Sequence, residues 1–236
     1  MTLQEDNFGN RNFMVLAIDG PAGAGKTTIA KELARQLGFC LLDSGALYRT
    51  MALALIRAGV DPDVEVIPSA LLDSINIKVI PSVGGMAINL DAEDVSSEIR
   101  SEKIGSAASR FSVRPEVRRS LMDIQRSLAN QCHLVAEGRD MGAIVFPFAQ
   151  VKFFLTADPE ERARRRYEEL IQKGEKMLYS DILSEMRVRD CRDRTRSIAP
   201  LTPARDATII DTSNKAPDQI VQMMLEQIRA TIGALK

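Results

Sequence analysis

The sequence is poor in the residues that build disulfides, stacking surfaces and membrane anchors. Its 236 residues include no tryptophan, three tyrosines, one histidine and three cysteines. Cys40, Cys132 and Cys191 are far apart and form no C-x-x-C pair, which indicates reduced thiols in a cytosolic compartment. No run of about 18 apolar residues occurs, and the polar, acidic start lacks the pattern of a signal peptide. We expect a cytoplasmic protein whose residues 1–12 form a flexible tail.

The balance of charges argues against a strongly basic surface. Lys and Arg number 31 against 32 Asp and Glu, so the formal net charge is −1. With so few aromatic side chains for stacking, neither a nucleic-acid partner nor a membrane partner is expected. The hydrophobic share of 45% is enough for a sizeable core, and the length suits one large domain or a domain with a small insert. Nothing in the sequence demands a partner chain, so we expect a monomer.

The apolar pattern predicts alternating strands and helices. Residues 13–18 (FMVLAI) form a short continuous apolar run that ends in Asp-Gly-Pro, as a strand buried on both faces does. Residues 26–37 repeat apolar positions at helical spacing, and Gly38 can end that helix. Further strand-like runs occupy residues 39–43, 133–137, 151–157 and 207–211, with helical stretches such as 115–129 and 217–232. This alternation predicts a doubly wound parallel α/β sheet across one domain, residues 13–236.

One segment departs from this alternation. Within residues 64–110 the stretches IKVIPS and MAINL alternate around Val83, Gly84 and Gly85 as the strands of a hairpin do. We therefore expect an inserted subdomain with a small antiparallel sheet at residues 64–110. A later arginine-rich region, residues 158–180, is expected to form a lid.

A glycine-rich loop follows the first predicted strand. It matches G-x-x-x-x-G-K-[ST] and lies between a strand and a helix, the context that this phosphate-binding motif requires. Backbone N–H groups and the helix N-terminus would hold ATP phosphates, Lys26 would reach the β- and γ-phosphates, and Thr27 could ligate Mg²⁺. The predicted ATP-binding residues are Gly20, Pro21, Ala22, Gly23, Ala24, Gly25, Lys26, Thr27 and Thr28. A solvated turn, or a nucleotide binder that transfers nothing, remains the alternative.

Arginines cluster between residues 162 and 196. If residues 180–196 are helical, Arg189, Arg192 and Arg196 share one face. Arginine suits bidentate phosphate recognition, whereas the simpler alternative is a solvated helix whose charges pair with one another. The phosphate loop favours the first reading, because a kinase with a phosphorylated acceptor must offset two sets of negative charge and exclude water.

Four stretches together resemble the bacterial cytidylate kinases. They are IDGPAGAGKTT (residues 18–28), LLDSGALYR (41–49), EGRDMGAIVFP (137–147) and RDCRDRTRSIAPL (189–201), and they span nearly the whole chain. The resemblance implies transfer of a phosphate from ATP to CMP or dCMP with Mg²⁺, catalysed by a P-loop kinase core with a nucleotide-binding insert.

The resemblance also implies roles for particular residues. The CMP-binding set would be Ser44, Tyr48, Arg49, Arg139 and Arg196 around the acceptor phosphate, Ser109, Arg118 and Asp140 at the cytosine, and Arg189 and Asp193 at the sugar. The catalytic set would be Lys26 with the lid arginines Arg162, Arg165 and Arg166. Glu137 and Ala143 stand where relatives carry other residues, so neither is expected to be essential.

Three other functions compete with this one. A kinase for shikimate, another nucleotide or a coenzyme precursor would share the loop but would not need the cytosine-reading residues. A switch GTPase would need N-K-x-D, which Asn214 and Lys215 miss by one residue, and Asp211, which imitates a Walker B carboxylate, is expected to be structural. A nucleic-acid-binding role is weakened by the net charge and the lack of aromatics.

Overall fold

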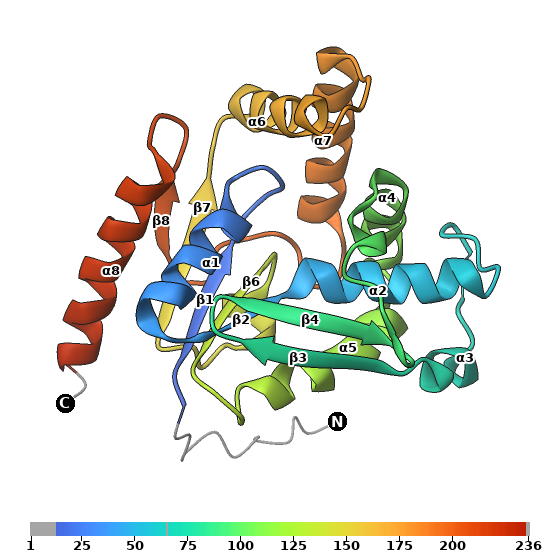
Figure 1. Ribbon diagram of the computed structural model, residues 1–236, viewed down its shortest axis with the longest axis horizontal. Coiled ribbons are helices and arrows are strands. Elements are labelled where there is room, and N and C mark those ends of the chain that lie inside the picture. Colours follow the sequence, from blue (N-terminus) through green and yellow to red (C-terminus); the bar gives the residue numbers. More distant parts are fainter. Residues whose placement is uncertain (1–12, 65, 235–236) are drawn as a thin grey trace.

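The computed structural model describes residues 13–64 and 66–234 of the chain (Figure 1). The predicted tail, residues 1–12, lies outside the described residues. None of the helices in the described part of the chain combines the length and apolar composition needed to cross a bilayer.

A five-stranded parallel sheet forms the centre of the molecule. Its strands are β1 Val15–Asp19, β2 Cys40–Asp43, β6 Leu134–Gly138, β7 Val151–Thr156 and β8 Thr208–Asp211, in the order β2-β6-β1-β7-β8. Each of these strands overlaps one of the predicted strand-like runs, and β1 is buried on both faces. The prediction of a parallel α/β sheet is confirmed.

Helices cover both faces of this sheet (Figure 1). On one face Leu16 and Ile18 of β1 pack in a core with α1 Lys26–Leu37 and α8 Pro217–Ala234. Val15 and Ala17, which point the other way because strand side chains alternate, pack in a second core with α2 Ser44–Arg57 and α5 Pro115–Leu128. This layering brings the carboxyl ends of the parallel strands to one edge, where the loops that follow them gather.

The small antiparallel sheet is also present. Strands β3 Ile77–Ser82, β4 Gly85–Leu90 and β5 Glu93–Asp94 pair in that order, with helices α3 Ser69–Ser74 and α4 Glu102–Phe111 on either side in the chain. The β3–β4 pairing confirms the predicted hairpin. Gly84 occupies its turn with φ +65°, and its N–H donates to Phe39 O at 3.2 Å, which joins the turn to the main domain. The proposed bounds of the insert, 64–110, stay a prediction.

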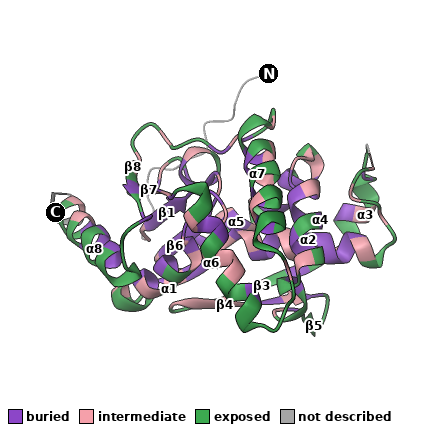
Figure 2. Cartoon of the chain, turned by 90° about the horizontal axis from the view of Figure 1, so that it is seen from above, coloured by how far each residue is buried: buried purple, intermediate pink, exposed green. Residues whose placement is uncertain are grey.

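The arginine-rich segment forms two helices, α6 Pro159–Gln172 and α7 Tyr179–Thr195. They pack together through Ala163, Leu170, Ile182 and Met186, a small core separate from the other two. In Figure 1 they lie above the carboxyl edge of the sheet, and Figure 2 shows much of α7 exposed. A pair that rests on so small a core is less firmly fixed than the sheet, which suits the predicted lid at residues 158–180.

Candidate active site

The phosphate loop joins β1 to α1 at the carboxyl edge of the sheet. Gly25 precedes α1 with φ +85° and offers no side-chain cap, so the first N–H groups of the helix stay free for a ligand. Gly20 has φ +149°, and a Cβ there would lie 2.1 Å from Leu155 O. The glycines of the motif are therefore required by the backbone path of this loop.

Lys26, Thr27 and Glu137 meet at the base of the loop. Nζ of Lys26 is buried and donates to Pro21 O at 2.7 Å, and burial lowers the pKa of Lys26. Burial also raises the pKa of Glu137, which lies at the end of β6 and shares a hydrogen bond with the Thr27 side chain. Neither charge is well solvated at its buried position. A bound anion would favour charged Lys26, and a cation would favour ionised Glu137.

This corner fits a magnesium ion carried by a nucleotide. Oε1 of Glu137 is buried with no hydrogen-bond partner, and the Thr27 hydroxyl lies beside that carboxylate. Within the described residues no group of three or more His, Cys, Asp or Glu side chains could hold a metal alone. Mg²⁺ typically takes only one or two protein ligands and completes its shell with phosphates and water. Glu137 was not expected to be essential, because some relatives carry another residue there. Its place at the end of a predicted strand is the sequence feature that indicates a role at this edge of the sheet.

Half-buried arginines gather opposite the loop. Burial, and next the charge of Arg139, lower the pKa of Arg189 to about 10. Burial likewise lowers the pKa of Arg49 and of Arg196. Nε of Arg189 and one terminal nitrogen of Arg196 are buried with no hydrogen-bond partner. The cluster is thus electrostatically incomplete without an anion such as a phosphate. Ser44, buried at the start of α2, belongs to the same motif as Arg49.

A buried carboxylate–guanidinium set adjoins this cluster. Asp140 forms an ion pair with Arg118, and its other oxygen lies 3.9 Å from Arg196. The Arg118 guanidinium also lies over the ring of Tyr48, 5.6 Å from its centroid. These four predicted residues, from α2, α5, the loop after β6 and the end of α7, are brought together by the fold.

The remaining predicted CMP residues lie around this set. Nε of Arg139 donates to Asp193 Oδ2 at 2.9 Å, and the arginines around Asp193 lower its pKa against the opposing effect of burial. Ser109, buried on α4, accepts a hydrogen bond from Arg192 at 2.9 Å. Arg192 was not among the predicted site residues, although it shares a helical face with Arg189.

An aspartate fixes the loop that carries Arg139 and Asp140. The carboxylate of Asp19, at the end of β1, accepts from the backbone N–H groups of Met141 at 2.7 Å and Gly142 at 2.8 Å. These residues begin a π-helical turn, Met141–Val145. Burial raises the pKa of Asp19 to about 6 despite those two donors. The contact ties the predicted base-reading loop directly to the phosphate loop.

The three predicted lid arginines have different surroundings. Arg162 is buried, and its guanidinium donates to Ala157 O at 2.9 Å, to Ala22 O at 3.1 Å and to Asp190 Oδ2 at 2.6 Å. These contacts brace the phosphate loop from the side of α6. The predicted contact of Arg162 with ATP phosphates stays a prediction, because its donors are engaged with the protein here.

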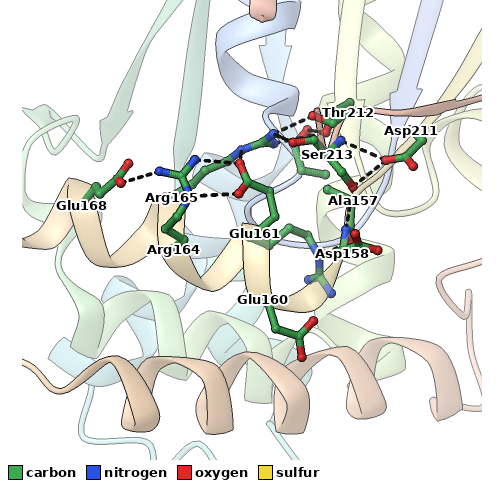
Figure 3. Close-up of polar contacts among 12 residues, drawn as sticks. Ala157, Asp158, Glu160, Glu161, Arg164, Arg165, Glu168, Asp211, Thr212 and Ser213 are labelled. Carbon is green, nitrogen blue, oxygen red and sulfur yellow. Dashed lines mark hydrogen bonds and ion pairs between the residues drawn. The ribbon is translucent and has the colours of Figure 1, made fainter. Parts of the chain in front are cut away.

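Arg165 reaches the loop after β8 (Figure 3). It donates to Oγ1 of Thr212 at 3.1 Å, to Thr212 O at 2.6 Å and to Glu161 at 2.9 Å. A cavity of about 420 Å³ opens beside these contacts, lined by Gly25, Thr28, Glu161, Arg164, Arg165 and residues 213–217. Residues 213–217 were not among the predicted site residues. Their position directly after a predicted parallel strand is the sequence feature that could have identified them.

The fold and this edge define the class of the protein. A parallel sheet with a glycine loop between β1 and α1, an arginine cluster and a small antiparallel insert is that of a P-loop kinase. Among solved structures, an uncharacterized protein from Eubacterium ventriosum ATCC 27560 aligns with TM-score 0.50 at 14% identity, covering 91% of this chain and 98% of the other. At that identity the likeness concerns the fold alone.

Sequence comparison identifies the family. The family model described as cytidylate kinase matches residues 16–230. The cytidylate kinase of Pasteurella multocida (strain Pm70) is 44% identical over 218 residues, 92% of this chain and 96% of that protein. The cytidylate kinase of Vibrio parahaemolyticus serotype O3:K6 (strain RIMD 2210633) is 45% identical over 219 residues, 93% of this chain and 97% of that protein. The chain belongs to the cytidylate kinase family.

Proposed function

We propose that this protein transfers the γ-phosphate of ATP to CMP or dCMP, with Mg²⁺, giving ADP and CDP or dCDP. The observation that carries the proposal is the buried Asp140–Arg118 pair beside an arginine cluster in which buried nitrogens of Arg189 and Arg196 make no hydrogen bond. Family membership supports the same activity.

The acceptor phosphate is held by the incomplete arginine cluster. Arg49, Arg139 and Arg196 supply donors there, and Ser44 adds a hydroxyl at the N-terminus of α2. A phosphate between these guanidiniums removes their mutual repulsion, so part of the binding free energy comes from relieving that repulsion. Tyr48 packs under Arg118 and closes the apolar side of this pocket.

The cytosine is read by groups of matching polarity. Its N4 amine donates to Asp140, while its N3 and O2 accept from the Arg118 guanidinium and the Ser109 hydroxyl. Uracil offers an oxygen in place of the amine, which would face the Asp140 carboxylate without a proton between them. Arg189 and Asp193 hold the sugar.

The phosphate loop holds ATP. Residues 20–28 enclose the phosphates, Lys26 pairs with the β- and γ-phosphates, and the cavity along Arg165 and residues 213–217 has room for the rest of the nucleotide. Thr27 and Glu137 would hold Mg²⁺, which would supply positive charge next to the transferring phosphate. In-line transfer between nucleotides needs positioning and charge neutralisation more than a strong base. The lone histidine, His133, accepts from Met14 N at 3.0 Å and stacks on Phe39, away from the phosphate loop.

The predicted lid, residues 158–180, covers this reaction. Its helix α6 brings Arg162, Arg165 and Arg166 to the ATP side, and its movement over the bound substrates would exclude water that otherwise hydrolyses ATP. We further propose that the enzyme acts as a cytoplasmic monomer without nucleic-acid or membrane partners. Light scattering on the purified protein tests the oligomeric state.

The test of the function is a panel of acceptors. ADP release from Mg·ATP, coupled to NADH oxidation, is measured with CMP, dCMP, UMP, AMP, GMP and shikimate in turn. We expect CMP and dCMP to be strongly preferred. If another acceptor wins, the kinase chemistry stands and the assignment of the substrate is wrong.

A further inference from the structure

One face of α4 lies against arginines of three other helices, α2, α6 and α7. Glu102, Gly105 and Ser109 lie at i, i+3 and i+7 of α4 and therefore share this face. Ser109 contacts Arg192 of α7, as described above. Glu102 forms an ion pair with Arg166 of α6. A Cβ on Gly105 would lie 3.8 Å from Nε of Arg49, so the backbone of α4 borders the acceptor site there.

The partner of Glu102, Arg166, also pairs with a second carboxylate. One terminal nitrogen contacts Glu102 on α4, and the other contacts Glu169 one turn along α6. The Arg166 side chain is 25% exposed, and those of Glu102 and Glu169 are 43% and 48% exposed. Ion pairs this open to water add little to folding stability. The two pairs differ in geometry: Glu169 is local to α6, whereas Glu102 joins the insert to the predicted lid.

The charge of Arg166 acts on the acceptor site. After burial, and together with other neighbouring charges, Arg166 contributes to the lowered pKa of Arg49 and of Arg189. Its guanidinium is thus part of the same positive field. A carboxylate at the edge of such a field repels incoming phosphates and weakens their binding. Glu102 offsets this cost if it keeps the Arg166 guanidinium in a fixed position. Two of the five N–H donors of Arg166 suffice for the two carboxylates, and others remain for a phosphate.

We propose that Glu102 is a positioning residue of this kinase, which holds the Arg166 guanidinium at the site of phosphoryl transfer through the ion pair between α4 and α6. The proposal rests on the proposed function and adds a residue outside the family-derived set. Arg166 touches the transferring phosphate, and Glu102 acts through Arg166. Because Glu102 belongs to the insert and Arg166 to the lid, the pair also sets how the two parts meet around the substrates.

The experiment compares Glu102→Gln with Glu169→Gln. Each substitution removes one of the two carboxylate partners of Arg166 and keeps the size of the side chain. Since small displacements of a positioning group lower the rate of the chemical step, we expect Glu102→Gln to lower kcat about tenfold while KM for CMP changes by less than about threefold. Glu169→Gln should keep kcat within about twofold.

A third variant separates positioning from a general charge effect. In an Arg166→Ala background the Glu102→Gln substitution should have no further effect on kcat, because the group that it positions is gone. A wild-type kcat in Glu102→Gln, an equal loss in Glu169→Gln, or an undiminished effect in the Arg166→Ala background would each overturn the proposal. Those results all require a wild-type protein that phosphorylates CMP. A wild type that is inactive on CMP would instead overturn the proposed function.

Discussion

Replacing Asp140 with alanine should lower both the stability of the protein and its selectivity for cytosine. The first effect comes from the buried ion pair with Arg118, and the second comes from the hydrogen bond to the base. Asp140 is 2% exposed and its partner Arg118 is 4% exposed, so the variant leaves a buried guanidinium without a counter-charge. Removing one partner of a buried pair typically costs about 3–5 kcal/mol. The second guanidinium near Asp140, that of Arg196, has a buried nitrogen that makes no hydrogen bond and lies 3.9 Å from the Asp140 carboxylate, so losing this charge adds to the cost. We therefore expect a loss of at least about 3 kcal/mol in the free energy of unfolding.

The effect on selectivity follows from the lost hydrogen bond to the base. A hydrogen bond to a charged group contributes about 1.5–3 kcal/mol, and each 1.4 kcal/mol is a factor of ten. The ratio of kcat/KM for CMP to that for UMP should thus fall roughly 10- to 100-fold in Asp140→Ala. Urea denaturation and the coupled kinase assay measure the two effects on the same preparation.

A double variant provides the control. Arg118→Met together with Asp140→Ala removes both charges, so it should recover at least about 1 kcal/mol of the lost stability. It should not recover selectivity for CMP, because neither polar partner of the base is restored. If Asp140→Ala keeps the wild-type preference for CMP over UMP, the assignment of Asp140 to the base is wrong. If the free energy of unfolding of Asp140→Ala equals that of the wild type, the buried Asp140–Arg118 pair does not stabilise the protein and this part of the prediction is wrong.

Three further predictions concern single side chains. Lys26→Met should lower kcat by about 10²–10³. It should leave the melting temperature unchanged or higher, since the buried ammonium makes one hydrogen bond to Pro21 O and methionine fills the same space. Full turnover in this variant would refute the role of Lys26 in phosphate transfer. Asp19 has its pKa raised from 3.8 to about 6, so its ionisation costs the folded state up to about 3 kcal/mol as pH rises through that window. Between about pH 4 and 7 the free energy of unfolding of Asp19→Asn should therefore rise relative to that of the wild type. Urea titrations that show no such change would contradict the raised pKa of Asp19. Arg162→Met leaves Asp190 without its buried partner and should cost about 3 kcal/mol, roughly 6–12 °C in Tm by calorimetry, whereas an unchanged Tm would contradict a bracing role for Arg162.

The strands of the sheet could be predicted because their signal is local. Residues 13–18 are apolar without interruption, and residues 133–137 contain the apolar run Leu-Val-Ala. The observed β1 and β6 overlap these two ranges with shifts of one or two residues. The phosphate loop could be predicted for the same reason, since its motif lies within eight consecutive residues and its three glycines have positive φ. The hairpin of the insert likewise follows from alternation around Gly84.

The surroundings of individual side chains could not be predicted, because they depend on elements distant in the sequence. Arg162 and Arg166 belong to one run of arginines, yet Arg162 is buried against Asp190 of α7 and Arg166 pairs with Glu102 of α4. The sequence of the π-helical turn after Asp140, MGAIV, does not differ from that of an ordinary apolar run. Its shape is held by a carboxylate more than a hundred residues earlier, Asp19, which pairs with backbone groups of that turn.

The central claim is that the protein makes CDP from CMP. The most direct measurement incubates purified protein with Mg·ATP and CMP and separates the nucleotides by anion-exchange chromatography. Our account predicts CDP and ADP in equal amounts, little ADP when CMP is left out, and little turnover with UMP. Release of ADP without formation of CDP, or equal turnover with UMP, would contradict it.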